Sequence, residues 1–256
     1  MSKSKQSSKD TRSKTKIQLQ AKCIKSEKVE EPQLKELWTL RLAYLKLTMT
    51  EAQDYRRFCD YCTRPNTYIF TFRDSSGDLQ AFYTFSSHLA DHDGKKGVLL
   101  HSKYYYVNTP ARGHPKIPAS AWQLLPKLLL RYGLKRLYIV AFSFPTSYVS
   151  LTRTFGRSYT IQGDDATPWE RLVLASLAHE LNGENWDAKN GVIRQQNVPI
   201  GEDKAASKNV TELREAYLRM NPQWAEGVSL PIMMRLDLAT IRSLIETNIR
   251  RSKRAK

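Results

Sequence analysis

Apolar residues in the segment 33–63 follow the spacing of amphipathic helices. Leu34, Leu37 and Trp38 begin a nearly helical rhythm. A second rhythm starts after Thr50, a residue type that caps helix N-termini, and ends before Pro65. The pattern predicts two consecutive helices.

Three β-rich runs follow these helices. The first two, in "TYIFTFRDSSGDLQAFYTFSS", flank "DSSGD", a turn signal that predicts a hairpin. The third, "KKGVLLHSKYYYV", is apolar or aromatic at almost every position. Such a run is typical of a strand that is covered on both faces of its sheet.

Helices and strands then alternate. We expect a helix over residues 119–132, closed by Gly133 and disturbed by Pro126. "LKRLYIVAFSF" predicts a buried strand, "PTSYVSLTRTFG" a short helix from Pro145 to before Gly156, and "RSYTI" another strand. This order, with its short connections, predicts an α/β fold with a mixed central sheet flanked by helices.

The pattern changes beyond Pro168. "PWERLVLASLAHELNG" is an amphipathic helix, a polar stretch follows it, and the segment 210–249 predicts helix, loop, apolar strand and helix. We therefore expect a core of residues 31–165 and an α-rich C-terminal extension of residues 166–249 packed on it.

The composition indicates a globular protein. The 256 residues are 41% hydrophobic, which is enough for a substantial core. No run approaches the ~18 apolar residues of a membrane span, and no secretory signal is visible. Three cysteines do not form a disulfide framework. A cytoplasmic protein without a membrane span is expected.

The net charge of +16 is concentrated at the two ends of the chain. The first 28 residues hold nine basic and two acidic side chains, a net +7, and the last seven, "RRSKRAK", add +5, so only +4 remains between them. We expect disordered basic tails over residues 1–30 and 250–256. Nucleic-acid contact through such tails would be weak and non-specific.

The turn after the third strand carries the most specific pattern. In "YYYVNTPARGHPKIPASAWQLLP" an aromatic strand runs into a Gly/Pro turn and then into a helix. The segment 34–161 resembles the GNAT acyltransferase superfamily. In that family the central strand splays and runs into a V-x-P-x-x-R-G-x-G-type loop, whose amides and following helix N-terminus hold the coenzyme A pyrophosphate.

The resemblance implies four cofactor-binding residues, and two prolines depart from it. Val107, Arg112 and Gly113 match the loop pattern, and the amide of His114 would join them. Pro115 and Pro118 stand where glycines are wanted, and each removes a backbone donor. We expect coenzyme A affinity that these prolines weaken.

The resemblance also covers the helix at Pro145. The family carries a general-acid tyrosine four residues before the glycine that ends this helix, and Thr152 occupies that position here. A threonine hydroxyl can hydrogen-bond a leaving thiolate but is a poor proton donor. Tyr148, one turn earlier, is the nearby phenol. Near the C-terminus, the segment from Asn221 to Gly227 resembles a poorly characterised branch of bacterial GNAT-like proteins, in which it leads into a closing strand.

His101 is the candidate general base because it precedes the aromatic run on the central strand. A strand histidine satisfied by hydrogen bonds is the alternative reading. Tyr104, Tyr105 and Tyr106 should alternate between the two faces of the sheet.

Two further groups are read as structural. "HLADHDG" contains zinc-ligand residue types in a predicted loop, without the organised set that a metal needs, so no metal site is predicted. Cys59 and Cys62 form a lone C-x-x-C on a helix and are read as half-buried small residues.

Two functions agree with these observations. The first is an acyl-CoA-dependent acyltransferase that moves an acetyl or longer acyl group from coenzyme A to the nitrogen or oxygen of an unknown acceptor. His101 would be its base, and Tyr148 or Thr152 would lie near the leaving sulfur. The alternative is a non-catalytic GNAT-like interaction protein whose basic tails contact nucleic acid or acidic surfaces.

Overall fold

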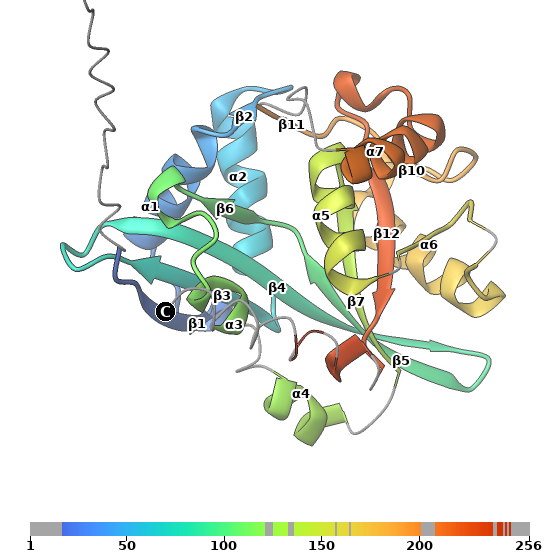
Figure 1. Cartoon of the computed structure of the whole chain (residues 1–256), viewed down its shortest axis with the longest axis horizontal. Helices are drawn as coiled ribbons and strands as arrows, with labels where there is room; N and C mark the ends of the chain where they lie inside the picture. The colour runs from blue at the N-terminus through green and yellow to red at the C-terminus, as the bar shows by residue number, and fades with distance from the viewer. Residues whose placement is uncertain are drawn as a thin grey trace, which may run out of the picture.

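A computed structural model describes residues 17–120, 125–132, 136–156, 158–163, 165–200, 208–237, 240–242, 244 and 246 (Figure 1). Its centre is an eight-stranded mixed sheet in the order β1-β3-β4-β5-β7-β12-β8, with β6 paired to β4. The strands of this sheet are β1 (Gln20–Lys25), β3 (Thr67–Arg73), β4 (Leu79–His92), β5 (Lys95–Ser102), β6 (Tyr105–Val107), β7 (Arg136–Ser143), β8 (Tyr159–Thr160) and β12 (Leu230–Arg235). The predicted mixed α/β fold is confirmed.

Helices cover both faces of the sheet. One face packs against α1 (Glu31–Leu42), α2 (Glu51–Cys62) and α6 (Pro168–Asn182). The other packs against α3 (Lys116–Ser120), α4 (Leu125–Tyr132), α5 (Pro145–Phe155) and α7 (Lys208–Met220). Short strands β2 (Leu45–Lys46), β9 (Trp186–Asp187), β10 (Val192–Ile193) and β11 (Val198–Pro199) complete the connections.

Local signals in the sequence explain several of these elements. Thr50 caps α2, accepting a hydrogen bond from the amide of Gln53. Pro145 stands at the start of α5, and Gly156 ends it in the left-handed conformation with φ +78°. The predicted hairpin forms as β3 and β4, antiparallel and in register from Thr67–Ser86 to Phe72–Ala81.

The structure differs from the expected N-terminal tail. Residues 20–25, expected to be disordered, form β1, which pairs with β3 along its whole length and makes an edge of the sheet. Leu19 and Ile24 are buried against the core, at 3% and 8% exposure. The lysines of this segment led to the prediction of a disordered tail, whereas an edge strand also carries polar side chains on its solvent face. The rest of the expected tails, residues 1–16 and 250–256, lies outside the described residues.

Within the segment 119–132, where a helix is expected, the structure describes α3 up to Ser120 and α4 from Leu125, and residues 121–124 lie outside the described residues. Pro126 lies within the described part of α4. Gly133, expected to end this helix, lies outside the described residues.

The C-terminal extension is built into the sheet. Strand β12 lies between β7 and β8 and is antiparallel to both. The segment from Asn221 to Gly227 leads into it, as the resemblance implied. Gly227 has φ +81°, and a Cβ there would lie 2.4 Å from the carbonyl oxygen of Gln196, so this turn requires glycine.

A small second sheet joins the extension to the connection between α1 and α2. Strand β11 pairs with β2, and the amide of Ile200 donates to the carbonyl of Tyr44. Within the described residues, no helix is both long enough and apolar enough to cross a membrane.

Candidate active site

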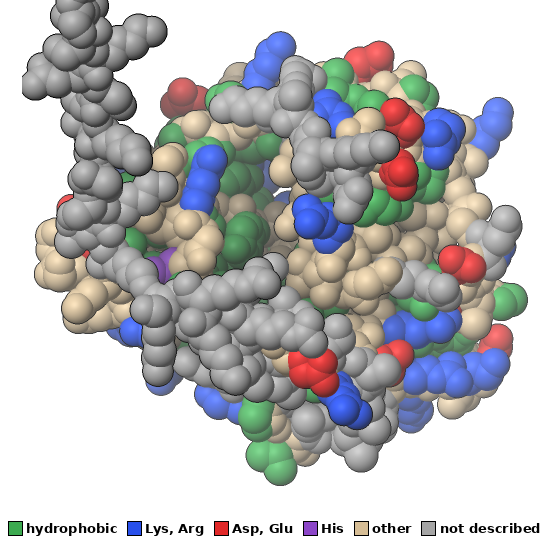
Figure 2. Space-filling view, viewed as in Figure 1, with side chains coloured by type: hydrophobic (Ala, Val, Ile, Leu, Met, Phe, Trp, Pro, Cys, Tyr) green, Lys and Arg blue, Asp and Glu red, His purple; other side chains and the backbone are tan. Residues whose placement is uncertain are grey.

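The sheet opens between β5 and β7. These two strands are parallel and paired from Gly97–Arg136 to Ser102–Ala141. Beyond that point β6 pairs only with β4, whereas the end of β7 continues beside β12. Figure 2 shows this face hollowed between the part that holds α2 and β6 and the part that holds α5, with hydrophobic side chains in the hollow. The opening lies where the sequence resemblance implies a splayed central strand.

The turn after β6 lies beside this opening and keeps a compact geometry. Val107 ends β6, and its carbonyl accepts a hydrogen bond from Nε of Arg112 at 3.5 Å. The Arg112 side chain is exposed, and its guanidinium carbon lies 5.8 Å from the centre of the Tyr44 ring. Gly113 adopts φ +78° and is also exposed. A cation and an approachable backbone therefore stand together here.

The backbone donors of this turn are mostly used within the turn. The amides of Ala111, Arg112 and His114 donate to the carbonyls of Asn108, Thr109 and Ala111. The amide of Lys116 donates to Nδ1 of His114 at 3.2 Å. The expected contribution of the His114 amide to phosphate binding would therefore require this turn to rearrange. The Gly113 amide has no acceptor among the described residues.

Helix α5 contributes the two hydroxyl candidates to the opposite side of the opening. Tyr148 is buried, and its ring centre lies 5.3 Å from that of Tyr217 on α7. The hydroxyl of Thr152 lies 2.7 Å from the hydroxyl of Ser158. Both residues thus belong to the face of the sheet that α5 and α7 cover.

His101 lies on the other face of the sheet and is completely buried. Its ring centre is 4.5 Å from that of Phe142, and Nδ1 lies 3.3 Å from the Tyr61 hydroxyl. Nε2 has no hydrogen-bond partner within the described part of the chain. Burial, with smaller contributions from nearby positive charge, holds the pKa of His101 well below its usual range. The structure does not bring His101 together with Tyr148, and it leaves the imidazole neutral and enclosed.

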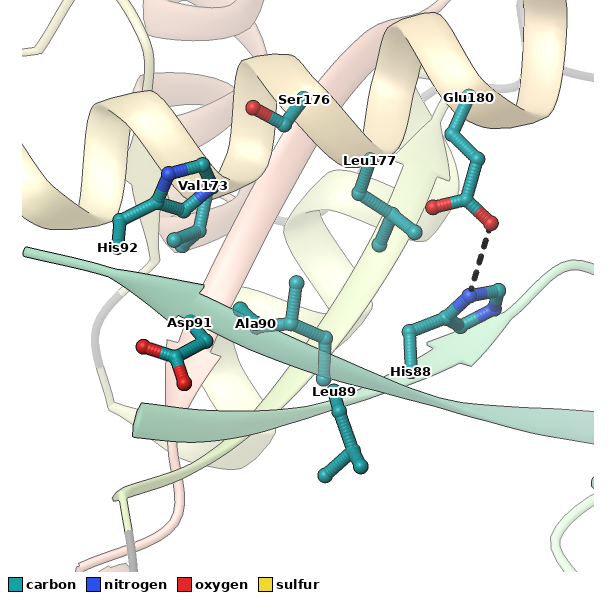
Figure 3. A pocket seen from close by; sticks show the side chains of 10 residues that line it. His88, Leu89, Ala90, Asp91, His92, Val173, Ser176, Leu177 and Glu180 are labelled. Carbon is teal, nitrogen blue, oxygen red and sulfur yellow. Dashed lines mark ion pairs between the residues drawn. The ribbon is translucent and has the colours of Figure 1, made fainter. Parts of the chain in front are cut away.

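A chain of hydrogen bonds leads from His101 to the surface. The Tyr61 hydroxyl lies 3.2 Å from that of Ser86, which lies 2.9 Å from Nε2 of His88. Nδ1 of His88 pairs with Glu180 of α6 at 3.4 Å (Figure 3). Burial lowers the pKa of His88, although Glu180 opposes the shift. His88 and Glu180 line a pocket of about 300 Å³ between β4 and α6.

The residues of "HLADHDG" that could bind zinc lie on opposite faces of the strand that holds them. The segment is the end of β4 and its turn, not a loop throughout. His88 and His92 point toward α6, whereas Leu89 and Asp91 point away (Figure 3). Among the described residues, no three His, Cys, Asp or Glu side chains converge to hold a metal ion. Cys59 and Cys62 pack in the core beneath α2 as free thiols.

The tyrosines of β6 and the residue before it alternate as predicted. Tyr104 is buried, with its ring centre 5.1 Å from that of Phe58, and Tyr106 lies on the same face beside Phe82. Tyr105 is 59% exposed and stacks on Tyr83 on the other face. Aromatic rings therefore line the α1–α2 face of the strand that leaves the opening.

A buried ion pair supports this aromatic wall. Arg41 and Asp54 are 4% and 2% exposed and make two hydrogen bonds, one of them 2.7 Å long between Nη2 and Oδ1. Trp38 and Asn197 also donate to the Asp54 carboxylate. Burial would raise the pKa of Asp54, but these donors and the charge of Arg41 outweigh it and lower the pKa. Asn197 belongs to the C-terminal extension, so the extension helps to hold α1 against α2.

Sequence reasoning missed Lys103. It follows Ser102, the last residue of β5 that pairs with β7, and precedes buried Tyr104. Its Nζ lies 5.0 Å from the ring centre of Tyr61 and 5.6 Å from that of Tyr104. The available signal was a single lysine inside the apolar run "VLLHSKYYYV".

Comparisons with known proteins give similarity in fold at low sequence identity. No protein-family model and no curated protein matches the chain. A probable N-acyltransferase from Enterococcus faecalis is 17% identical with a TM-score of 0.40, over 56% of this chain and 33% of that one. This chain therefore spans about a third of the length of that protein.

Two smaller acetyltransferases are covered almost completely. A ribosomal-protein-alanine N-acetyltransferase from Brucella melitensis is 15% identical, with a TM-score of 0.38, over 59% of this chain and 96% of that one. An aminoglycoside 6'-N-acetyltransferase from Acinetobacter baumannii is 12% identical, with a TM-score of 0.38, over 53% and 86%. Each of these two alignments covers somewhat more than half of this chain.

Proposed function

We propose that the protein is an acyltransferase that takes an acyl group from acetyl-CoA or a longer acyl-CoA and moves it to an amine or hydroxyl acceptor. The observation that carries this proposal is the opening between β5 and β7. Ser102 and Ala141 form the last rung, and the strands then leave each other next to a turn that holds an exposed arginine and a left-handed glycine. We expect an extended thioester to enter there, with its charged end toward the turn.

Contacts on the two sides of the opening would serve different ends of the ligand. Arg112 and the free amide of Gly113 suit the phosphates. Tyr148 and Thr152 lie on α5, the helix that follows β7, and suit the leaving sulfur. The amide of His114 already donates to the carbonyl of Ala111 within the turn. We therefore expect an affinity for acyl-CoA in the micromolar-to-millimolar range.

Calorimetric titration of acetyl-CoA and butyryl-CoA into the full chain tests the proposal. Alternation along β5 places the Ser102 side chain on the face of Leu100, which α3 and α4 cover, so a bulky residue there would obstruct the opening. We expect Ser102→Trp to abolish binding and Arg112→Ala to weaken it about tenfold.

Arg56→Ala is the matched control, because Arg56 is an exposed arginine on α2, remote in sequence from the turn. Binding that is unchanged in both Ser102→Trp and Arg112→Ala would place any ligand elsewhere. No binding of either acyl-CoA at millimolar concentration would refute the acyltransferase and favour an interaction protein. A melting curve for each variant separates lost binding from lost folding.

A further inference from the structure

We propose that Lys103 is the proton-accepting side chain of this reaction and takes the proton of the acceptor as the acyl group moves. The inference rests on the acyltransferase function proposed above. It replaces His101 in that role, because the imidazole is enclosed by Tyr61 and Phe142 and is completely buried.

The position of Lys103 in the sheet is the first argument. β5 and β6 are interrupted between Ser102 and Tyr105, at the point where pairing with β7 ends. The amine projects onto the face covered by α1 and α2, since its nearest rings are those of Tyr61 and Tyr104. Lys103 is half-buried, whereas both of those tyrosines are buried, so the amine remains within reach of a molecule in the opening.

The surroundings of the amine are the second argument. No carboxylate pairs with Lys103 in the part of the chain that the structure describes. The charged groups that act most on its amine through their electric field are instead cations: Arg64 after α2, Arg41 of α1 and Arg57 of α2. The Arg41 charge is balanced by Asp54. The other titratable groups nearby are Tyr61, Cys62, His101 and Tyr104.

Those four groups stay neutral around pH 7. Burial raises the pKa values of Tyr61, Cys62 and Tyr104 and lowers that of His101. Burial first, and then the three arginine charges, lowers the pKa of Lys103 to about 7. A substantial share of the molecules therefore carries a free amine at neutral pH, which is the form that can accept a proton.

The step balances without any further reactant. The acceptor nitrogen or oxygen attacks the thioester carbonyl, a C–N or C–O bond forms, and the C–S bond breaks. The proton of the acceptor passes to Nζ of Lys103, giving an ammonium group. The coenzyme A thiolate leaves with the electron pair of the C–S bond.

Competitive labelling with deuterated acetic anhydride measures the amine directly in the full chain. Mass spectrometry would follow Lys103 and Lys96 between pH 5.5 and 10, with and without unlabelled acetyl-CoA. Lys96 is the control because it lies on β5, is exposed and pairs with Asp91. We expect Lys103 labelling to rise around pH 7, and saturating acetyl-CoA to slow it at least fivefold at Lys103 only. A Lys103 profile that rises only near pH 10, as at an ordinary lysine, overturns the proposal, as does an unlabelled acetyl group transferred to Lys103 itself.

Release of coenzyme A thiol from acetyl-CoA, with water as the acceptor, tests the role in transfer. We expect Lys103→Met and Lys103→Arg to lower this rate at least tenfold without changing calorimetric affinity, and Lys96→Met to leave it unchanged. In the wild-type chain the rate should rise with pH through about 7. Equal rates in all variants overturn the proposal while leaving the acyltransferase intact. Absence of acetyl-CoA binding refutes both the acyltransferase function and the role of Lys103 in it. This outcome differs from the previous one because acetyl-CoA then leaves the labelling of Lys103 unchanged.

Discussion

The two sides of the opening bury different kinds of polar group. On the α1–α2 side, Arg41 and Asp54 pair in the interior, His101 is buried, and half-buried Lys103 lies two residues further along the chain. On the α5–α7 side, the polar groups next to the apolar cluster are neutral. Tyr217 donates to the carbonyl of Ser143, and Asn221 donates to Tyr217.

This difference indicates that the two sides of the opening have different roles. Buried charge is costly and becomes tolerable only with a partner, so an interior rich in ionisable groups is a place where chemistry is expected. A neutral, hydrogen-bonded interior stabilises the fold without the desolvation penalty of a buried charge. The α1–α2 side would therefore carry proton chemistry, and the α5–α7 side would act as a rigid wall.

The largest effect is expected from removing half of the buried ion pair. Asp54→Ala would leave Arg41 charged and without its carboxylate in the interior, which costs about 3–5 kcal/mol. Urea unfolding followed by circular dichroism measures the loss. Asp60→Ala, an exposed aspartate on the same helix, should change stability by no more than about 0.5 kcal/mol. Similar losses in the two variants would show that the ion pair does not set this side apart.

The second largest effect is expected at Gly227, in the turn that leads into β12. Gly227→Ala would place Cβ against the Gln196 carbonyl and keep a left-handed φ, for a loss of about 2–4 kcal/mol. Gly156→Ala is the matched control, because its φ of +78° is similar and a Cβ there meets no atom within 4 Å. It should cost only the conformational part, about 1–2 kcal/mol. Thermal unfolding of the two variants separates steric clash from backbone strain.

A smaller loss is expected in the neutral network. Tyr217→Phe would leave the Ser143 carbonyl and the Asn221 amide without one of their partners, at about 1–3 kcal/mol. Tyr148→Phe, on the neighbouring helix, removes a hydroxyl with no hydrogen bond to the described residues and should cost under about 0.5 kcal/mol. Chemical denaturation of both variants is sufficient. A loss from Tyr217→Phe as large as that from Asp54→Ala would remove the contrast between the two sides.

The last effect has the opposite sign. Lys103 has a pKa of about 7 in the fold against 10.5 for an ordinary lysine, so between these values the unfolded chain binds a proton that the folded chain leaves off. The lysine therefore destabilises the fold increasingly as pH falls from 10.5 to 7, and by a constant amount below that. We expect Lys103→Met to melt at a higher temperature than the wild-type chain at pH 7. Differential scanning fluorimetry across pH 6–10 should show this advantage shrinking toward pH 10, and a constant advantage would contradict the assignment.

The local elements of this protein could be predicted because their signals are local. Thr50 caps α2, Pro145 and Gly156 bound α5, and "DSSGD" turns β3 into β4, each through the conformational preference of a few neighbouring residues. The alternation of Tyr104, Tyr105 and Tyr106 follows from strand geometry in the same way. The mixed sheet itself follows from the order of these elements.

The placement of the candidate site was decided by contacts between distant segments. β1 is a strand because β3 offers it an edge, and its lysines alone read as a tail. The amide of His114 is unavailable because it donates a hydrogen bond to the carbonyl of Ala111. His101 is closed off by Tyr61 from α2 and Phe142 from β7.

By itself, the sequence determined most of the helices and strands of the core, which faces are apolar and which turn carries a cation beside a glycine. Only the tertiary structure decided which polar groups have a hydrogen-bond partner, which are exposed to solvent and which are buried away from water. The physical reason is that a proton affinity depends on the dielectric and on charges brought within a few ångströms, and the chain assembles these around Lys103 from α1, α2 and the end of β5.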